Sequence, residues 1–262
     1  MTTSLFTPDR RAGLRSTLLQ YAARDSRISG VAITGSAAAE REDRWSDIDL
    51  AFGIGDAAEL PNVLTDWTAR MYEQHLAVHH CDVKAGAWIY RVFLLPDTLQ
   101  VDLAFVPAAE FRALTPTFRL VSGEAQEPRH APAPLPADII GLAWLYALHA
   151  RCSIARGNVW QAEYMISGIR DHALALASIR HGLPAAHGRG LDRLPSEVTA
   201  PFEDSLVRRL DTAELSRTLQ AAVAGLLREI EFLDQALAGR LEAPLKSLNK
   251  GLSPTSATRS GE

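Results

Sequence analysis

The stretch TGSAAAEREDRWSDIDLAF, residues 34–52, decides the fold, because it places two aspartates in an apolar segment typical of a buried β-strand. Side chains alternate along a strand, so Asp47 and Asp49 share one face while Ile48 and Leu50 point to the other. A rise of about 3.3 Å per residue puts the two aspartate α-carbons roughly 6.6 Å apart. Like charges this close repel each other, and burial adds a desolvation cost. The pattern therefore predicts that a cation neutralises the pair.

Magnesium is the natural candidate, because it is a hard cation that prefers oxygen ligands. A site with two metal ions about 3.5–4 Å apart usually needs a further carboxylate. Asp102, in the segment LQVDLAFV at residues 99–106, can supply it. This aspartate also interrupts an apolar strand and shares a face with the small Ala104. The alternatives for Asp102 are a hairpin cap and an ion pair with Arg91.

A Gly-Ser pair precedes the two aspartates and predicts an anion-binding turn. Gly35 lets the backbone approach a phosphate closely, and successive amides at a helix start form an anion cradle. The Ser36 hydroxyl can donate one hydrogen bond to a phosphate oxygen. Ser36 could also simply cap the short helix expected after Gly35, and capping uses the same geometry.

The segments around this stretch predict an α/β region up to residue 125. Thr7 and Pro8 indicate the start of a helix, and helical periodicity returns at residues 60–76. Apolar runs rich in β-branched and aromatic residues predict strands, the last two joined as a hairpin by the turn PDT. The predicted strands are residues 29–34, 47–54, 77–83, 87–95 and 99–106.

Four prolines between Pro128 and Pro136 indicate an extended connector and a domain boundary. Beyond it, residues 137–157 and 158–182 predict helices that end at glycines, and apolar spacing predicts a long amphipathic helix over 211–240. We expect Trp144, Tyr146, Trp160 and Tyr164 in the core of this region. The predicted organisation is 1–125 catalytic domain, 126–136 connector, 137–245 helical domain and 246–262 disordered tail.

The chain contains four features in a fixed order: the pair GS, a gap of ten residues, the motif DID and a later strand with VDL. This pattern over residues 30–106 resembles the nucleotidyltransferase superfamily that includes DNA polymerase beta. Residues 157–176 further resemble bacterial aminoglycoside and lincosamide nucleotidyltransferases. The resemblance implies an α+β fold: a small mixed-sheet nucleotidyltransferase domain with flanking helices, followed by an all-α helical bundle.

The resemblance also implies a reaction. Asp47 and Asp49 would hold the magnesium bound to ATP or another NTP, and a second magnesium would be shared among Asp47, Asp49 and Asp102. A nucleoside monophosphate, taken as AMP, would move to a hydroxyl of a small molecule such as an aminoglycoside or lincosamide. Asp102 would help to take the hydroxyl proton, and Gly35 and Ser36 would bind the triphosphate.

Four further residues are candidates for substrate contacts, each with a plainer alternative. Arg44, with Arg41, lies in the loop before the aspartates and could reach the triphosphate, or it could be a surface arginine. Lys84 could contact the triphosphate or be an exposed loop lysine. Glu163 and Arg170 share a helix face that could bind the acceptor or could be a solvated polar face.

Charge and composition limit the partners. Residues 1–137 carry 13 Lys and Arg against 17 Asp and Glu, and no basic stripe of the kind that grips nucleic acid stands out. An acidic half suits divalent cations or a cationic small molecule. No apolar run is long enough to span a bilayer and no signal peptide is evident, so we expect no membrane partner and a cytoplasmic location.

Three alternatives remain open at this point. The acceptor could be tRNA or protein, as in nucleotidyltransferases of toxin–antitoxin type. The chain could be a catalytically silent nucleotide-binding member, although all three carboxylates are present. A homodimer could form through residues 211–240, whose other role is packing within the bundle.

Overall fold

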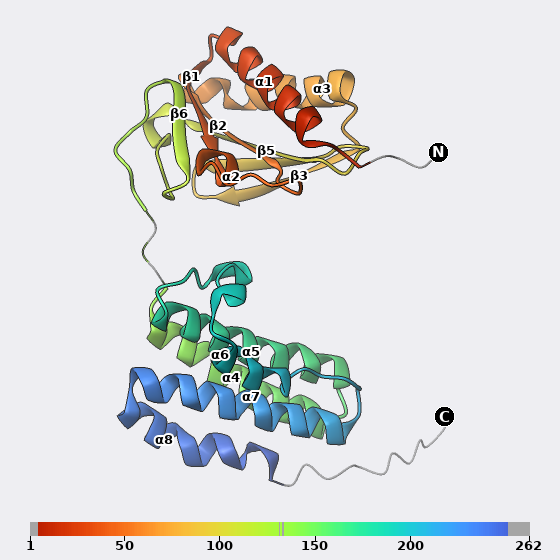
Figure 1. Ribbon diagram of the computed structural model, residues 1–262, viewed down its shortest axis with the longest axis vertical. Coiled ribbons are helices and arrows are strands. Elements are labelled where there is room, and N and C mark those ends of the chain that lie inside the picture. The colour runs from red at the N-terminus through yellow and green to blue at the C-terminus, as the bar shows by residue number, and fades with distance from the viewer. Residues whose placement is uncertain (1–4, 131, 133, 251–262) are drawn as a thin grey trace. The chain divides into compact units, whose positions relative to one another are not determined.

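The computed structural model describes residues 5–130, 132 and 134–250, and it divides the chain into two compact units, Met1–Pro132 and Ala133–Glu262. Figure 1 shows the helices and strands of both units. The first unit is a mixed sheet with flanking helices and the second is helical, which confirms the predicted α+β class. The main elements of the first unit are α1 (Pro8–Arg24), β1 (Ile28–Thr34), α2 (Gly35–Ala38), β2 (Ile48–Ile54), α3 (Leu60–His75), β3 (His79–Ala85), β4 (Trp88–Leu94), β5 (Gln100–Pro107) and β6 (Phe118–Gly123).

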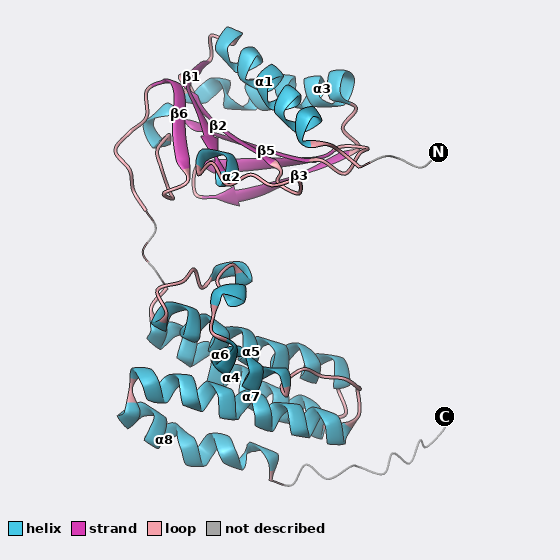
Figure 2. Cartoon of the chain, in the orientation of Figure 1, coloured by secondary structure: helices cyan, strands magenta, loops and turns pink. Residues whose placement is uncertain are grey.

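The six strands form one sheet in the order β3-β4-β5-β2-β1-β6 (Figure 2). β2 and β5 run parallel, whereas the other four neighbouring pairs are antiparallel. The predicted hairpin is confirmed as β4 and β5, and Thr7 caps α1 by accepting a hydrogen bond from the Arg10 amide. The parallel pair matters most for the site, because it places the starts of β2 and β5 side by side.

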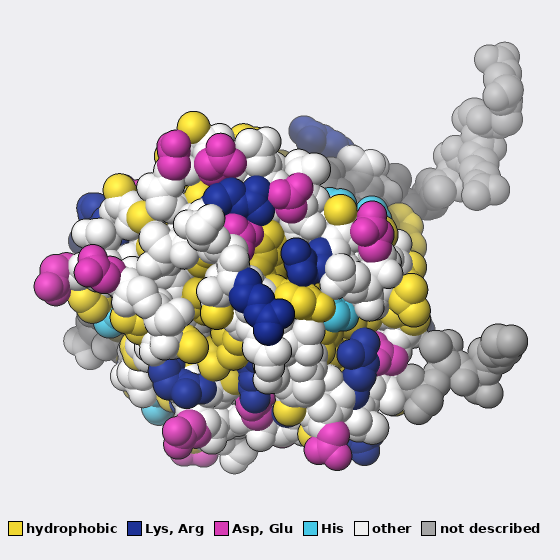
Figure 3. All heavy atoms as spheres, turned by 90° about the horizontal axis from the view of Figure 1, so that it is seen from above, with side chains coloured by type: hydrophobic (Ala, Val, Ile, Leu, Met, Phe, Trp, Pro, Cys, Tyr) yellow, Lys and Arg dark blue, Asp and Glu magenta, His cyan; other side chains and the backbone are white. Residues whose placement is uncertain are grey.

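One face of the sheet is covered by α1 and α3 (Figure 1). The side chains between them form the larger core of the unit, because β2 and β5 send alternate apolar residues to this face. Seen from the side of α1 and α3, Lys and Arg side chains are interspersed with Asp and Glu rather than gathered in a stripe (Figure 3). The strand residues that build this core are Ile48, Leu50, Phe52, Ile54, Val101, Leu103 and Phe105.

The opposite face carries a smaller apolar cluster. Ala51 of β2 and Ala104 of β5 lie under Trp88 and Phe111, and all four side chains are buried. Because side chains alternate, Asp49 and Asp102 also belong to this face, two residues before the alanines. The cluster therefore supports the same side of the sheet from which the carboxylates project.

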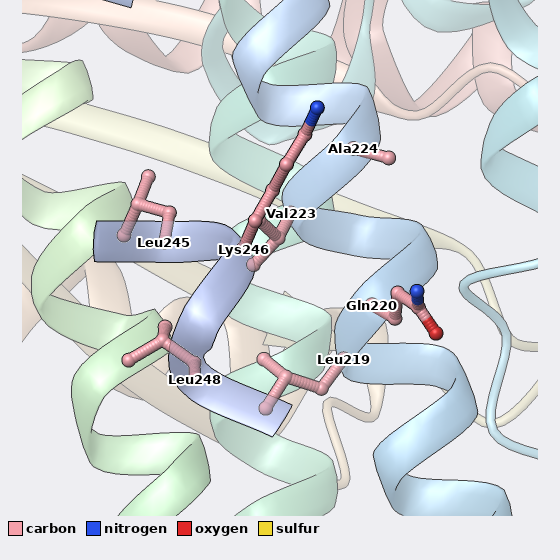
Figure 4. Close-up of a pocket in the computed structure, with 7 residues that line it drawn as sticks. All are labelled: Leu219, Gln220, Val223, Ala224, Leu245, Lys246 and Leu248. Atoms are coloured by element: carbon pink, nitrogen blue, oxygen red, sulfur yellow. The ribbon is translucent and has the colours of Figure 1, made fainter. Parts of the chain in front are cut away.

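The second unit is a helical bundle of α4 (Pro136–Ala155), α5 (Val159–Arg180), α6 (Ser196–Glu203), α7 (Thr212–Leu233) and α8 (Gln235–Lys246). Its core comes from the facing sides of α4, α5 and α7. A buried ion pair joins α5 to α7, since the Arg180 guanidinium donates to both carboxylate oxygens of Glu229 at 3.0 and 3.1 Å. Leu245 and Leu248 pack against Leu219 and Val223 of α7, and a pocket of about 150 Å³ remains between them (Figure 4).

Several predictions for the second unit are corrected. The long segment 211–240 is two helices, because Asp234 has φ −155° and ψ 93°, ends α7 and caps α8. The predicted tail starts too early, since a helical turn continues over Ser247–Asn249 and Leu248 is 4% exposed. Residues 251–262 of that tail lie outside the described residues.

The aromatic residues of the second unit also differ from prediction. Trp160 and Tyr164 are 74% and 63% exposed, and the Tyr164 ring lies at the edge of the bundle, 6.3 Å between centres from the ring of Tyr146 on α4. Trp144 on α4 is exposed as well, and only Tyr146 of the four packs against the core. In the described part of the chain, no helix is long and apolar enough to cross a membrane.

Candidate active site

Three carboxylates meet at the start of the parallel strand pair. Asp49 of β2 lies directly opposite Asp102 of β5 in the register, and Asp47 stands one residue before β2 begins. Asp47 accepts a hydrogen bond at Oδ2 from Gln100 Nε2 at 3.2 Å, which ties the loop before β2 to the first residue of β5. Strand pairing therefore brings together three residues that are far apart in the sequence.

Asp102 is largely buried and lies near the negative charge of Asp47. Burial first, and the negative charge of Asp47 second, raise the pKa of Asp102 to about 6. Its Oδ1 atom is buried and has no hydrogen-bond partner in the described part of the chain. A buried carboxylate oxygen without a partner costs free energy unless a proton or a cation compensates it. This oxygen can therefore accept a proton or bind a cation.

The turn before α2 approaches the carboxylates closely. Gly35 has a φ of +64°, and a β-carbon built at this position would lie 2.0 Å from Asp49 Oδ2. Glycine is therefore required for two reasons: the left-handed backbone and the room taken by the carboxylate. Next to it, Ser36 has a buried hydroxyl without a hydrogen-bond partner among the described residues. Its donor is free for a ligand.

The donor set fits a divalent cation, although the carboxylates do not form a ready-made cage. Among the residues that the structure describes, no group of three or more His, Cys, Asp or Glu side chains is arranged to hold a metal ion. The fit rests on the chemistry of the donors, which are oxygens of Asp47, Asp49 and Asp102, and on the unpartnered Asp102 Oδ1.

Lys84 is not brought to the carboxylates. Along the ladder Lys84 pairs with Ile89 and Ile89 pairs with Phe105, so Lys84 belongs to the face covered by the helices. Asp102 instead pairs with Val92, on the opposite face. The predicted contact of Lys84 with the triphosphate therefore lacks the required geometry.

Arg91 does not pair with Asp102 either. It lies on the face covered by the helices, where its Nε and Nη2 donate to the two carboxylate oxygens of Asp82, each at 2.7 Å. Its Nη1 donates to Thr68 of α3 at 2.6 Å. The alternative of an Asp102–Arg91 ion pair is therefore not found.

Arg44 remains in the loop between the glycine turn and the aspartates. Its guanidinium lies 4.3 Å from the centre of the exposed Trp45 ring, a cation–π contact at the surface. Arg41 is also exposed in this loop. The structure thus leaves both arginines accessible at the surface.

Glu163 and Arg170 lie on α5, in the second unit. Glu163 Oε1 accepts a hydrogen bond from Ser167 Oγ at 2.7 Å, and Arg170 Nε lies 3.5 Å from Asp171 Oδ1. Trp160 lies three and four positions before the half-buried Glu163 and the exposed Tyr164, so it neighbours both on the helix surface.

Three residues near the site were not predicted. Gln100 donates a hydrogen bond to Asp47. It lies two residues before Asp102 in the same strand, and this spacing could have indicated that both side chains lie on the same face of the sheet. Tyr90 stacks on Trp88 with ring centres 5.8 Å apart, and burial and the charge of Asp102 raise the pKa of Tyr90. Arg11 holds the loop before Asp47; its signal was a charged residue within the apolar stripe of the first helix.

Comparison with known proteins gives similarities to solved structures only. No protein-family model matches the chain, and no curated protein matches it. Among solved structures, an aminoglycoside 6-adenyltransferase from Bacillus subtilis is similar, with 12% sequence identity and a TM-score of 0.38. The similarity covers 88% of this chain and 95% of that one.

Proposed function

We propose that the chain is a magnesium-dependent nucleotidyltransferase that moves a nucleoside monophosphate, AMP in the first instance, from an NTP to a hydroxyl of a small molecule. The observation that carries the proposal is the parallel register of Asp49 and Asp102, with Asp47 at the start of the same strand. Asp47, Asp49 and Asp102 were all predicted from the sequence as metal ligands, and the pairing of Asp49 with Asp102 supports this grouping.

Asp47, Asp49 and Asp102 are the residues that would hold magnesium. Bound Mg²⁺ supplies charge neutralisation for the triphosphate and lowers the pKa of an acceptor hydroxyl. The protein contributes oxygen ligands on two adjacent strands, fixed by the sheet. The close contact between Gly35 and Asp49 puts the glycine turn within reach of the same ligands.

Ser36 and the turn around Gly35 would bind the triphosphate. The Ser36 hydroxyl is a buried donor without a partner in the described residues, and phosphate oxygens are strong acceptors. Arg44 and Arg41 are the exposed cations nearest in sequence to the aspartates and would contact the outer phosphates. Lys84 has no part in this proposal.

Asp102 would accept the proton of the acceptor hydroxyl. Without metal, burial and then the charge of Asp47 raise the pKa of Asp102 to about 6, and bound Mg²⁺ would lower it again and keep the carboxylate ionised, the form that can accept a proton. The hydroxyl oxygen forms a bond to the α-phosphorus, the bond between the α-phosphorus and the bridging oxygen breaks, and pyrophosphate leaves.

The exposed side of α5 would contact the acceptor. Trp160 and Tyr164 flank Glu163, and such a set of two aromatic rings and one carboxylate suits a cationic molecule with apolar ring faces. Arg170 is the neighbouring cation on this helix. The acceptor class, an aminoglycoside or lincosamide, rests on the sequence resemblance of residues 157–176.

A transfer assay tests the proposal. The protein would be incubated with Mg²⁺ and α-labelled ATP, GTP, CTP or UTP, and with aminoglycosides, lincosamides, total tRNA or lysate protein as acceptors. Asp47→Asn and Asp49→Asn serve as inactive controls of nearly equal volume. Asp56→Asn is a matched active control, since Asp56 caps a short helix at Ala58.

Label on a small molecule that is lost in both inactive controls and kept in Asp56→Asn would support the proposal. Label confined to tRNA or protein would replace the acceptor with a macromolecule. No label on any acceptor, together with no Mg²⁺-dependent binding of a non-hydrolysable nucleotide, would refute the function.

A further inference from the structure

Arg11 is a charged residue on the buried side of α1. Its side chain is 6% exposed, and it shares the buried stripe of the helix with Leu14, Leu18 and Ala22. A guanidinium in such a position is costly unless its donors find partners. The hydrogen-bond partners of the Arg11 guanidinium therefore indicate its structural role.

The partners of Arg11 all lie in the loop that precedes Asp47. Arg11 Nη1 donates to the backbone oxygens of Asp43 at 2.6 Å and Ser46 at 2.9 Å. Its Nε lies 3.1 Å from Glu42 Oε1, an ion-pair contact without hydrogen-bond geometry. Arg15, one helical turn later, donates to the same Glu42 oxygen at 2.5 Å. Two arginines of α1 thus fasten one loop.

The loop is also closed on itself. Asp43 Oδ1 accepts hydrogen bonds from the Trp45 amide at 2.8 Å and from Ser46 Oγ at 3.0 Å. The Asp43 amide donates to Ser46 Oγ at 2.9 Å. Residues 43–46 therefore form a compact turn, and Arg11 attaches this turn to α1 as one piece.

The bond to the Ser46 oxygen bears directly on the site. That oxygen belongs to the peptide group that joins Ser46 to Asp47, and a peptide group is planar. A hydrogen bond to its oxygen consequently fixes the orientation of the plane from which the Asp47 backbone continues. On the other side, Gln100 binds the Asp47 carboxylate, so backbone and side chain are both held.

We infer that Arg11 is a positioning residue, which holds loop 42–46 against α1 and thereby sets where Asp47 stands in the metal site. The inference rests on the proposed function, because it assigns Asp47 a metal to bind. Arginine suits the task better than lysine, since its planar fork of donors reaches two carbonyl oxygens and a carboxylate at once.

The test compares metal binding and loop protection in Arg11→Met, Arg11→Lys and Arg27→Met. The affinity for Mn²⁺, used as the probe, is measured by electron paramagnetic resonance with a non-hydrolysable ATP analogue, well below the Tm of each variant. Hydrogen exchange is measured on the amides of residues 43–47. Arg27 is a suitable control, because its ion pairs are with Asp25 and Asp66 and not with the loop.

Arg11→Met is expected to bind Mn²⁺ at least tenfold more weakly and to exchange the loop amides faster, with Arg11→Lys between it and wild type. Arg27→Met is expected to lower the Tm and leave both readouts unchanged. Wild-type Mn²⁺ affinity in Arg11→Met would overturn this inference alone. Failure of the wild-type protein to bind Mn²⁺ would overturn the proposed function and this inference together.

Discussion

Gly35 is required both for its left-handed backbone and for the close approach of the Asp49 carboxylate, and substitution by alanine tests both requirements. Gly35→Ala would place a side chain in a left-handed backbone, at a cost of about 1–2 kcal/mol, and push its β-carbon into Asp49 Oδ2. We expect loss of turnover by at least a hundredfold, because the Asp49 carboxylate must move. Steady-state kinetics and the Tm of the variant would be measured.

Gly86 provides the matched control. Its φ is +60°, but nothing lies within 4 Å of an added β-carbon. Gly86→Ala should show the same backbone strain with activity near that of wild type. Equal loss of activity in both variants would mean that strain, and not displacement of Asp49, is responsible.

Asp102 should make stability depend on pH in a defined direction. Its pKa is raised in the folded protein, so its contribution to stability is present below about pH 4 and is lost as pH rises through about 6. In EDTA, Asp102→Asn should therefore be more stable than wild type at pH 7.5, by up to about 3 kcal/mol, and equally stable at pH 3.5. Urea unfolding at both pH values would measure this.

The same variant should lose turnover, because a neutral amide in place of the Asp102 carboxylate would be neither a metal ligand of equal charge nor a base. A stability gain joined to lost activity is the expected signature of a functional carboxylate. A variant with unchanged stability at pH 7.5 would contradict the burial argument for Asp102.

At the scale of single residues, the sequence named three carboxylates, whose role stays a prediction, and it gave no sign of the face on which Lys84 lies. Asp47, Asp49 and Asp102 each interrupt an apolar run, and alternation then fixes their side of the sheet. β3 is an edge strand whose helix-covered face carries only the polar His80, Asp82 and Lys84, so only its pairing with β4 reveals that Lys84 lies on the side away from the carboxylates. Arg11 stands out in the sequence as a charge in an apolar helix stripe, but its hydrogen-bond partners are backbone oxygens of a loop distant in sequence, which no pattern displays.

Among the elements, α7 and α8 show that a continuous apolar pattern can extend over two separate helices. Asp234 separates them, since its side chain accepts the Leu237 amide hydrogen bond at 2.8 Å and caps α8. We expect Asp234→Ala to lower the free energy of unfolding by about 1 kcal/mol through loss of this cap. Chemical denaturation would measure it, with the exposed Asp171→Ala as a control that should change it by less than about 0.5 kcal/mol.

β6 escaped prediction for a related reason. Its sequence FRLVSG is short, and its side chains are exposed or half-buried because it pairs only with β1 at the sheet edge. Neither alternation nor a long apolar run marks such a strand. The central strands were predicted well because burial on one or both faces leaves a strong pattern.

The exposed side of α5 gives an element-level prediction about the acceptor. Trp160→Ala should raise the KM for the acceptor at least fivefold and leave the KM for the NTP and the Tm unchanged, since the ring is exposed and outside the core. Phe232→Ala, which removes an exposed ring on α7, is the matched control and should not raise the acceptor KM. A raised KM for the NTP in Trp160→Ala would instead indicate a nucleotide contact.

For the molecule as a whole, the buried core residues fall into two sets, one in the sheet unit and one in the helical unit. The two clusters on either side of the sheet contain buried residues from Leu14 to Phe111, and the bundle core contains those from Ile139 to Leu248. The prolines between Pro128 and Pro136 were the sequence signal for this division. What the sequence could not supply is the parallel pairing of β2 with β5, because it joins strands that are separated by a helix and a hairpin.

Two independent cores lead to a last prediction, that each unit folds alone while transfer needs both. The fragment 1–132 contains the whole sheet, the three carboxylates and Ser36, and its size is ordinary for a domain. Expressed alone, it should give a cooperative thermal transition and bind Mn²⁺ with a non-hydrolysable ATP analogue. The fragment 133–262 should be helical by circular dichroism and bind neither. Neither fragment should transfer label, because the acceptor contacts that we propose lie on α5. Transfer by the fragment 1–132 at the wild-type rate would place the acceptor site entirely on the sheet unit and remove α5 from the mechanism.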